Sequence, residues 1–404
     1  MSKAFEGIRV LDLSQVLAGP SCGQHLALLG ADVIKIEPPV GGDQMRDRVL
    51  SSRLAPQGMA AAFLTMNIGK RSLALDIKSE RGKAVLFELI KGADAILHNF
   101  RAGVVDRLGL DYDSVRAVNP GIVYTVISGF GRTGPKAADP AYDGAVQAAS
   151  GMMANNGSPE SGPLRTGYMP VDLMTGMTAA YATTAALLRK ERTGEGQLVD
   201  VAMLDCAIVL QSANLSRHIV DDVEDSRIGN QSVAGVPTAS SFPTKDGSML
   251  SAAIMPNHVK ALFEVIGLAE LLDDPKYAGR EALIANKEEV QARIIEALKA
   301  DTAENWETKL VARGVPIAKI NSMAEVLELE QLKHRNVITP IPRPEGIDED
   351  LRMIGAPFVN DVDGPEANRP PPRLGQHSRE LLADLGITAE EVEAMIADGV
   401  VGAG

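Results

Sequence analysis

The chain is poor in aromatic residues, cysteine and basic charge. Phe, Trp and Tyr make up 4% of its 404 residues and the formal net charge is −13, so we expect no nucleic-acid partner. The two cysteines, Cys22 and Cys206, lie far apart without a CxxC spacing, which argues against a disulfide framework and against a zinc site. The six histidines show no ligand spacing such as HExxH, so no metal site is expected.

Long apolar runs are also missing. No run reaches the roughly 18 residues of a membrane span, and the N-terminal stretch MSKAFEGIRVLDLS lacks the apolar core of a signal peptide. We therefore expect a cytoplasmic protein with no membrane partner. Hydrophobic residues nevertheless make up 45% of the chain, which is enough for a substantial core, and the length allows two domains.

Strand-like and helix-like segments alternate through the first part of the chain. Strands are expected at 7–14, 31–39, 72–77, 93–100 and 121–131, with helical patterns between them. This alternation predicts an α/β fold in which helices flank a parallel sheet. The first turn reads LSQVLAGPSCG where a dinucleotide enzyme carries GxGxxG, and no GxxxxGK loop occurs. Neither NAD nor a nucleoside triphosphate is expected as a ligand.

Asp172 is the strongest candidate for a chemical role. It precedes LMTGMTAAYATTAALLRK, a run of small and apolar residues that ends in two cations and predicts a buried helix. With Pro170 before it, Asp172 is expected at the N-cap, where backbone N–H groups would hold it ionised. The alternative is that Asp172 only starts the helix. A Gly- and Pro-rich segment at 155–166 precedes it and places it at a loop-to-helix junction, which is typical of a cleft.

Several cations lie where strands end or begin. Arg101 follows an expected strand and precedes a helix, a position suited to anion binding, and Lys35, Lys70 and Arg71 flank neighbouring strands. Together they would attract a polyanion to an acidic protein. The alternative is that each is an ordinary solvated surface charge. Farther along, Tyr142 and Asp143 start a small-residue helix, where packing and capping are the simplest roles.

The composition also indicates domain boundaries. Residues 1–220 form the expected large domain, and 221–239 are polar and Gly-containing, as in a linker. Residues 240–335 form a smaller α+β domain that opens with a hairpin signalled by KDG in SFPTKDGSML. Residues 336–404 contain the Pro-rich passages TPIPRPEG and NRPPPRLGQHS and then two terminal helices, an extended segment able to return to the large domain.

A set of motifs carries a family resemblance. They are GIRVLDLSQVLAGPSCGQHLALLGADVIKIEPP, NIGKRSLALDIKS, HNFRAGVVDRLGLDY, GFGRTGP with AYDGAVQAASG, PVDLMTG and RTGEGQLVDVAMLD. Together they run through about half of the chain, and each alone is weak. The sequence resembles the class III coenzyme A transferases of the CaiB/BaiF family, which include formyl-CoA, carnitine-CoA and bile-acid-CoA transferases and the related α-methylacyl-CoA racemase.

The resemblance implies a Rossmann-like large domain built from both ends of the chain, a small central domain and a homodimer of interlocked rings. It implies a class III acyl-CoA:carboxylate CoA-transferase that moves CoA from an acyl-CoA to a small carboxylic acid, with no permanently bound cofactor. The family's catalytic aspartate falls on Asp172, which would form acyl-aspartyl and aspartyl-CoA intermediates. The implied CoA site comprises Arg101, Lys70, Arg71, Lys35 and Tyr142.

Two alternatives remain open. The first is a 2-methylacyl-CoA racemase or epimerase, in which a histidine and a glutamate would stand where this chain has Tyr142 and Met255. Neither residue serves as a base near neutral pH, so transfer is favoured. The second is a silent CoA-binding subunit, although such a copy has no reason to retain Asp172. Leu17 replaces a glutamine of the formyl-CoA enzymes and GNQSVAGVPT replaces their glycine run, so the acid is not identified.

Overall fold

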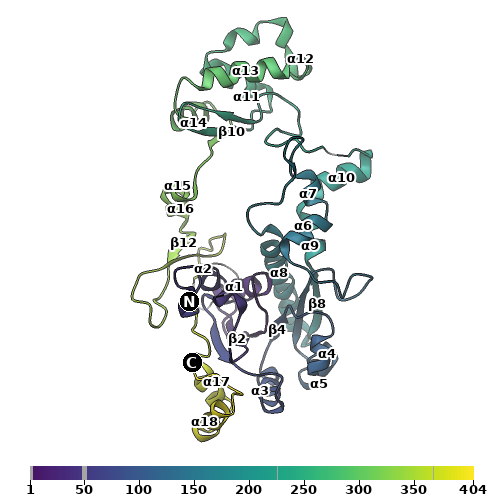
Figure 1. The fold of residues 1–404 in the computed structure, drawn as a ribbon, viewed down its shortest axis with the longest axis vertical. Coiled ribbons are helices and arrows are strands. Elements are labelled where there is room, and N and C mark those ends of the chain that lie inside the picture. Colours follow the sequence, from purple (N-terminus) through teal and green to yellow (C-terminus); the bar gives the residue numbers. More distant parts are fainter. Residues whose placement is uncertain (1–2, 48–51, 225, 367) are drawn as a thin grey trace. The chain divides into compact units, whose positions relative to one another are not determined.

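The computed structural model describes residues 3–47, 52–224, 226–366 and 368–404 (Figure 1). Its contacts divide the chain into two compact units. The first runs to Met152 and continues with Arg165–Val223 and Gln331–Gly404, and the second comprises Met153–Leu164 and Glu224–Glu330. The described part of 224–239, which the composition assigns to a linker, therefore groups with the second unit, whereas Asp225 lies outside the described residues.

A six-stranded parallel sheet forms the centre of the first unit and confirms the predicted α/β fold. The strand order is β3-β2-β1-β4-β5-β8. After β1, the chain adds β2 and β3 on one side, and it then adds β4, β5 and β8 on the other side, so the strand order reverses between β1 and β4. Val10 of β1 pairs with Val33 of β2 on one side and with Ala95 of β4 on the other. The strands are β1 (Arg9–Asp12), β2 (Asp32–Glu37), β3 (Arg71–Ala74), β4 (Ala95–His98), β5 (Val123–Ser128) and β8 (Gln197–Ala202).

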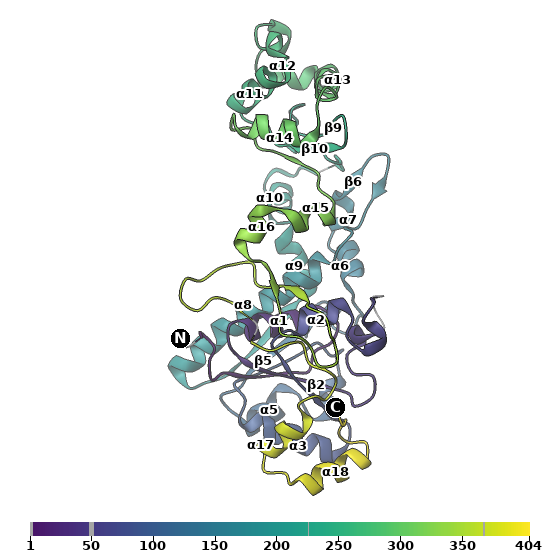
Figure 2. The same ribbon diagram turned by 90° about the vertical axis from the view of Figure 1, so that its left-hand side faces the viewer.

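Helices cover both faces of this sheet (Figure 2). On one face, α1 (Ala18–Leu28) packs against α8 (Pro170–Thr193) in a core that includes Leu26, Ala179 and Val33. The approach is close, because a Cβ on Gly176 of α8 would lie 2.7 Å from the carbonyl oxygen of Ala18. The helices of the opposite face are α3 (Glu80–Lys91), α5 (Tyr112–Val118), α17 (Ser378–Asp384) and α18 (Ala389–Ala397).

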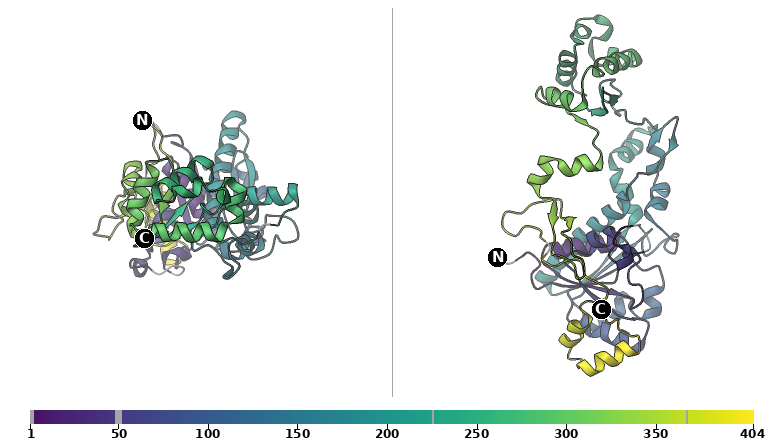
Figure 3. Two further views of the ribbon diagram at one scale, coloured as in Figure 1. Left: turned by 90° about the horizontal axis from the view of Figure 1, so that it is seen from above. Right: turned by 60° about the vertical axis from the view of Figure 1, so that its left-hand side comes forward.

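The C-terminal segment of the chain belongs to the first unit. Leu381 and Leu382 of α17 and Met395 of α18 are buried in the same core as Leu11 and Leu73 of the sheet. Figure 3 shows these two helices (yellow) beside the sheet. The remaining elements of this part are β12 (Ile338–Pro340), β13 (Arg352–Ile354) and α16 (Glu330–Arg335), whose first residue belongs to the second unit.

The other short elements of the first unit surround the carboxyl edge and the flanks of the sheet. The helix expected after the GFGRTGP loop is α6, and Tyr142 occupies its N-cap. The other short elements of the first unit are η1 (Gln44–Arg46), η2 (Ala55–Gln57), α2 (Ala61–Asn67), α4 (Val104–Leu108), α6 (Asp143–Ala149), α9 (Met203–Leu210) and α10 (Ser212–Asp221). Helix α7 (Met152–Asn155) crosses the division between the units.

The second unit has its own antiparallel sheet and helical core. Its strands β9 (Ser241–Pro243) and β10 (Ser248–Ser251) form the hairpin predicted from KDG, and β11 (Ile317–Lys319) pairs with β10. Phe263 and Trp306 are buried in its core. Its other elements are β6 (Gly157–Ser158), β7 (Gly162–Pro163), α11 (Pro256–Ile266), η3 (Ala269–Leu272), η4 (Pro275–Tyr277), α12 (Gly279–Ala285), α13 (Lys287–Leu298), α14 (Ala303–Val311) and α15 (Met323–Glu328).

Candidate active site

Asp172 lies inside the first turn of α8. The helix begins at Pro170, with Met169 at the N-cap, so Asp172 is the third residue of the helix. The prediction that Asp172 itself occupies the N-cap is therefore wrong. Proline suits the first helical position because it has no N–H to leave unpaired and its φ is already helical. The helix starts at this proline, three residues earlier than expected.

Asp143 supplies the cap of α8 from a neighbouring helix. Its Oδ2 accepts the backbone N–H groups of Val171 and Asp172 at 2.9 and 3.0 Å. Its Oδ1 accepts a hydrogen bond from Gln147, one turn farther along α6, at 2.5 Å. Asp143 is buried. It was expected to cap its own helix, but it holds the start of α8 instead.

Gln147 ties the segment before α8 to the same cluster. Its side-chain oxygen accepts the backbone N–H of Thr166 at 3.0 Å, and its amide group donates to the hydroxyl of Thr166, also at 3.0 Å. The sequence reasoning did not find Gln147 or Thr166. The spacing of Asp143 and Gln147, four residues apart on a helix, was the available signal, but nothing local points to the partners of these side chains in another segment.

The pKa of Asp172 is raised to about 7, chiefly by burial and then by the nearby carboxylate of Asp143. This corrects the expectation that a helix terminus would hold Asp172 firmly ionised. The two N–H groups at the helix start that could have stabilised its charge already donate to Asp143. Among the described residues, no hydrogen-bond partner contacts the carboxylate of Asp172. Its oxygens are thus left without a donor from the described part of the protein.

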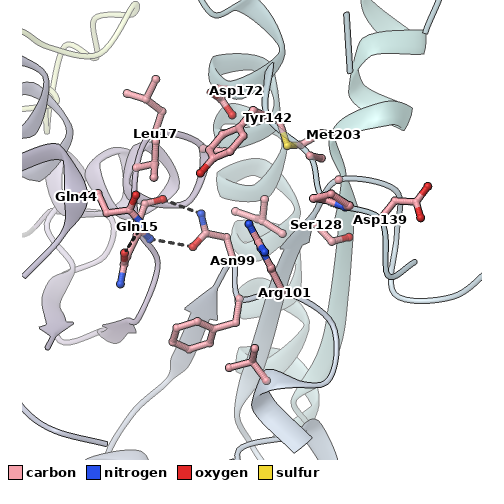
Figure 4. A pocket seen from close by; sticks show the side chains of 18 of the residues that line it. Gln15, Leu17, Gln44, Asn99, Arg101, Ser128, Asp139, Tyr142, Asp172 and Met203 are labelled. Atoms are coloured by element: carbon pink, nitrogen blue, oxygen red, sulfur yellow. Dashed lines mark hydrogen bonds between the residues drawn. The ribbon is translucent and has the colours of Figure 1, made fainter. Parts of the chain in front are cut away.

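A cavity of about 330 Å³ opens on one side of Asp172. It lies at the carboxyl ends of β1, β4 and β5, where the strand order reverses and ligands of such sheets bind. In Figure 4, Asp172 and Tyr142 lie at one end of this cavity and Arg101 lies toward the other. Reciprocal hydrogen bonds of 2.7 and 2.8 Å between Asn99 and the backbone of Gln15 fix two of its loops (Figure 4).

A second cavity of about 290 Å³ opens beside the first. Asp172 lines both cavities, as do Tyr142 and Leu17. The second cavity is also lined by Arg165 and Tyr168, which belong to the segment before α8. Asp172 therefore stands at the boundary of two spaces in the first unit, and a reagent in either one has access to its carboxylate.

Val16 also lines both cavities and has an unusual backbone conformation. Its φ is +71°, which is rare for a β-branched residue, and its N–H donates to Asp43 at 3.1 Å. Strained residues of this kind cluster at functional sites, where the surrounding structure enforces them. The sequence reasoning missed Val16, because nothing in its identity signals a positive φ.

Of the predicted CoA-site cations, the structure brings only Arg101 to these cavities. Arg101 is exposed and lines the first cavity. Tyr142, with 61% of its surface exposed, lines both. In the racemase alternative, a catalytic glutamate would stand at position 255. The residue at that position is Met255, which is the N-cap of α11 in the second unit.

Lys35, Lys70 and Arg71 are buried in ion pairs. The ammonium group of Lys70 donates to Asp12 at 2.7 Å and has no exposed surface. Lys35 is equally buried and lies 2.8 Å from Asp43. Arg71 donates to Asp32 and to Glu380 of α17, at 2.5 and 2.8 Å. In this structure the three cations connect strands and helices of the fold, which does not support their expected contact with CoA phosphates.

The chain is similar to proteins of one family along nearly its whole length. Residues 5–378 match the profile of CoA-transferase family III. The chain belongs to this family. It is 35% identical to a succinate–glutarate CoA-transferase of Agrobacterium fabrum, over 94% of this chain and 95% of that protein. It is 36% identical to a formyl-CoA:oxalate CoA-transferase of Streptomyces avermitilis, over 99% of this chain and 100% of that protein.

A solved structure agrees. The crystal structure of a CaiB/BaiF family protein from Brucella suis is similar with a TM-score of 0.86 and 30% identity, and the match covers 95% of this chain and all of that one. The predicted family is thereby confirmed, and with it the class of enzyme, a class III acyl-CoA:carboxylate CoA-transferase.

Two other features of this family III chain concern cofactors and membranes. Within the described ranges, no three His, Cys, Asp or Glu side chains gather as metal ligands, and Cys22 and Cys206 are buried. No helix of the described part combines the length and the apolar character needed to cross a membrane.

Proposed function

We propose that this chain transfers CoA from an acyl-CoA to a carboxylic acid through covalent intermediates on Asp172. The observation that carries the proposal is the carboxylate of Asp172, which lies without a hydrogen-bond partner among the described residues at the boundary of two cavities. A nucleophile needs free lone pairs and access to its substrate. Exchange between two acids further needs a site open to both, which the paired cavities supply.

The reaction begins on the ionised form of Asp172. Its oxygen attacks the thioester carbon of the acyl-CoA, the C–S bond breaks, and CoA leaves as a thiolate beside an acyl-aspartyl anhydride. The thiolate then attacks the aspartyl carbonyl, which releases the donor acid and leaves an aspartyl-CoA thioester. Over these two steps one C–S bond and one C–O bond break, and one bond of each kind forms. The exchange therefore needs no external energy source.

The second half of the reaction reverses these steps with the acceptor. The acceptor carboxylate attacks the aspartyl-CoA thioester and forms a new anhydride, from which the thiolate takes the acyl group. The product acyl-CoA leaves and Asp172 is regenerated as a carboxylate. A pKa of about 7 leaves a large fraction ionised at neutral pH while making the carboxylate more basic than an ordinary aspartate.

Arg101 is the proposed contact for CoA phosphates. Its guanidinium lines the first cavity and is exposed, so it can form bidentate bonds with a phosphate. Tyr142, at the boundary of both cavities, is proposed to contact the CoA end that carries the thioester. Lys35, Lys70 and Arg71 support the fold beneath this site and are not part of the proposed contact surface.

We also propose that the chain works as the interlocked homodimer that the family resemblance implies. Support comes from large apolar side chains exposed in the first unit, which an interface would cover. The exposed fractions are 76% for Tyr181, 57% for Val209, 78% for Ile219 and 78% for Val220. Light scattering on the purified protein tests this, and a monomer at micromolar concentration would contradict it.

Mass spectrometry of the covalent intermediate tests the mechanism. The protein is incubated with acyl-CoA alone, quenched and digested, and the peptide that contains Asp172 is expected to carry CoA as a thioester or, after hydroxylamine, a hydroxamate. Asp172→Asn should abolish both the label and CoA transfer. Asp205→Asn, which changes an exposed aspartate of α9, is the matched control and should be labelled normally. Label on another residue would reject Asp172 as the nucleophile.

The same incubation in heavy water separates transfer from racemisation. Transfer yields a new acyl-CoA only when an acceptor acid is present, whereas a racemase incorporates deuterium at the α-carbon of the original thioester. Deuterium incorporation without a new thioester would replace the proposed nucleophile by an acid–base role for Asp172. Absence of both reactions, despite CoA binding, would favour the silent subunit.

A further inference from the structure

Two loops contribute to the lining that the two cavities share. Val16 and Leu17, between β1 and α1, line both cavities, and so does Gln44 at the start of η1. Asp172 lines the same two cavities. The position of these loops therefore affects the space on either side of the carboxylate of Asp172.

A buried carboxylate joins the two loops. Oδ1 of Asp43 accepts the backbone N–H of Val16 at 3.1 Å and that of Met45, in η1, at 2.9 Å. The backbone N–H of Asp43 donates to Glu37, the last residue of β2, at 3.0 Å. Asp43 has no exposed surface. One residue therefore connects both loops to each other and to the central sheet.

Lys35 of β2 fixes this carboxylate. Its ammonium group, which also has no exposed surface, lies 2.8 Å from Oδ2 of Asp43. The same group donates to the carbonyl oxygen of Ser14 at 2.9 Å. The loop between β1 and α1 is thus held at two points, at Ser14 by Lys35 and at Val16 by Asp43.

Val16 needs this support because of its backbone conformation. A φ of +71° is unfavourable for every residue that has a Cβ, and most of all for a β-branched residue. Without an acceptor at position 43, the chain would relieve this strain by moving Val16 to a negative φ. That change reorients the peptide groups on both sides of Val16 and displaces Leu17, so the lining beside Asp172 would move.

The chemical nature of the pair also needs an explanation. Burial of two opposite charges is costly, and an apolar pair of the same shape is often as good for stability or better. An apolar pair offers no acceptor for the N–H of Val16 and no donor for the carbonyl of Ser14. The hold on this loop is what the ion pair adds to the fold.

From these contacts we infer that Lys35 and Asp43 are positioning residues for the reaction on Asp172, because they hold Val16 at a positive φ and with it the lining that both cavities share. Both side chains are fully buried, so they act through the loop and not on a substrate. The inference rests on the proposed function. It gives Lys35 a role other than the contact with CoA phosphates that the family resemblance implies.

The first test removes the pair without leaving an unpaired charge. Lys35→Met combined with Asp43→Leu replaces both side chains by apolar ones of similar shape, so this double variant should fold. We expect its kcat for CoA transfer to lie about 10- to 100-fold below that of the wild type, the loss that a displacement of about 1 Å causes at a reacting centre. The assay uses acetyl-CoA as donor and formate, propionate or succinate as acceptor.

Two further double variants serve as controls. Lys35→Gln combined with Asp43→Asn keeps a donor and an acceptor and should retain most of the activity. Lys190→Met combined with Asp94→Leu deletes another ion pair, whose atoms lie 2.6 Å apart and whose residues line neither cavity. This second variant should leave kcat unchanged.

The second test isolates the backbone of Val16. Val16→Gly and Val16→Ala both remove the branched side chain, but only glycine accepts a positive φ without strain. In the Lys35→Met/Asp43→Leu background, Val16→Gly should give a kcat about 5- to 30-fold above that of Val16→Ala, the factor that corresponds to the cost of a left-handed L-residue. In the wild-type background Asp43 enforces the conformation. There the two variants should have similar kcat, and Val16→Ala should unfold at a lower urea concentration than Val16→Gly.

The possible results separate this inference from the function on which it rests. Equal kcat in the wild type and in Lys35→Met/Asp43→Leu would overturn the inference, and so would equal kcat of the two Val16 variants in that background. If the double variant shows no cooperative urea transition, Lys35→Met alone replaces it in the same comparison, because it removes the group that holds both Ser14 and Asp43. Failure of the wild type to transfer CoA to any of the three acids would instead overturn the proposed function.

Discussion

One oxygen of Asp143 accepts the backbone N–H groups of both Val171 and Asp172, at 2.9 and 3.0 Å. The residue that anchors the start of α8 is thus a second carboxylate adjacent to the proposed nucleophile. The negative charge of Asp143 stabilises the positive N-terminal end of α8, and at the same time it disfavours ionisation of Asp172. A single contact therefore links the stability of α8 to the reactivity of the site.

The pH dependence of the reaction should reflect this contact. The pKa of Asp172 is raised to about 7 by burial and by Asp143, and only the ionised form attacks a thioester. We expect kcat/KM for acyl-CoA to rise with pH through a midpoint near 7 and to level off above it. In Asp143→Asn the repelling charge is gone, so the midpoint should move to lower pH. Steady-state kinetics from pH 5 to 9 measure both profiles, and equal midpoints would contradict the electrostatic coupling.

A second variant at the same position separates charge from capping. Asp143→Ala also removes the acceptor for the two N–H groups, which should destabilise the fold by about 0.5–2 kcal/mol, the usual range for a lost helix cap. Urea unfolding measures this difference. Asp143→Asn retains a side-chain oxygen and should lose less stability than Asp143→Ala.

Replacement of Asp172 should stabilise the protein at alkaline pH. The pKa of Asp172 rises from 3.8 to about 7 on folding, so the folded chain binds the extra proton and loses stability as pH rises across this interval. Asp172→Asn removes this penalty. Its Tm should exceed that of the wild type by roughly 2 °C or more at pH 8, and the difference should shrink toward pH 4. Asp205→Asn should show no such trend, and a Tm gain independent of pH would contradict the raised pKa.

Arg101 should affect the CoA substrate and not the acid. Arg101→Gln removes the exposed guanidinium from the first cavity, and we expect KM for acyl-CoA to rise about tenfold or more. The effect should weaken in high salt because the contact is ionic and exposed. Arg192→Gln, which removes an exposed arginine in the last turn of α8, serves as the control for a lost surface arginine. An unchanged KM in Arg101→Gln would reject the phosphate contact.

Lys70 should matter for stability. Removal of one partner of a buried ion pair leaves an unpaired buried charge, so Lys70→Met should lower the free energy of unfolding by about 3–5 kcal/mol. Lys91→Met breaks an exposed pair with Glu88 and should cost less than about 1 kcal/mol. If Lys70→Met unfolds like the wild type and instead raises KM for acyl-CoA, the originally expected role of Lys70 in CoA binding would be correct.

Local sequence was sufficient for the framework of the first unit. The alternation of apolar runs with helical patterns predicted strands whose observed counterparts lie within residues 7–14 and 121–131, because period and composition are properties of neighbouring residues. The motif PVDLMTG identified Asp172 before its surroundings were known. Arg101 was singled out by its position directly after an expected strand, and the structure places it in the lining of the first cavity.

Long-range contacts decided the environment of these residues. Whether Lys70 faces a ligand or the core depends on Asp12, which is 58 residues away and becomes its neighbour only when β1 and β3 enter one sheet. Asp143 lies 29 residues before Asp172, yet it caps the start of α8 and adds to the effect of burial that raises the pKa of the carboxylate of Asp172. Burial and pairing arise from packing between segments. The sequence by itself therefore singled out Asp172 and Arg101 as candidates. The tertiary structure decided that Lys35, Lys70 and Arg71 are neutralised in the core and that Arg101 remains exposed beside a cavity.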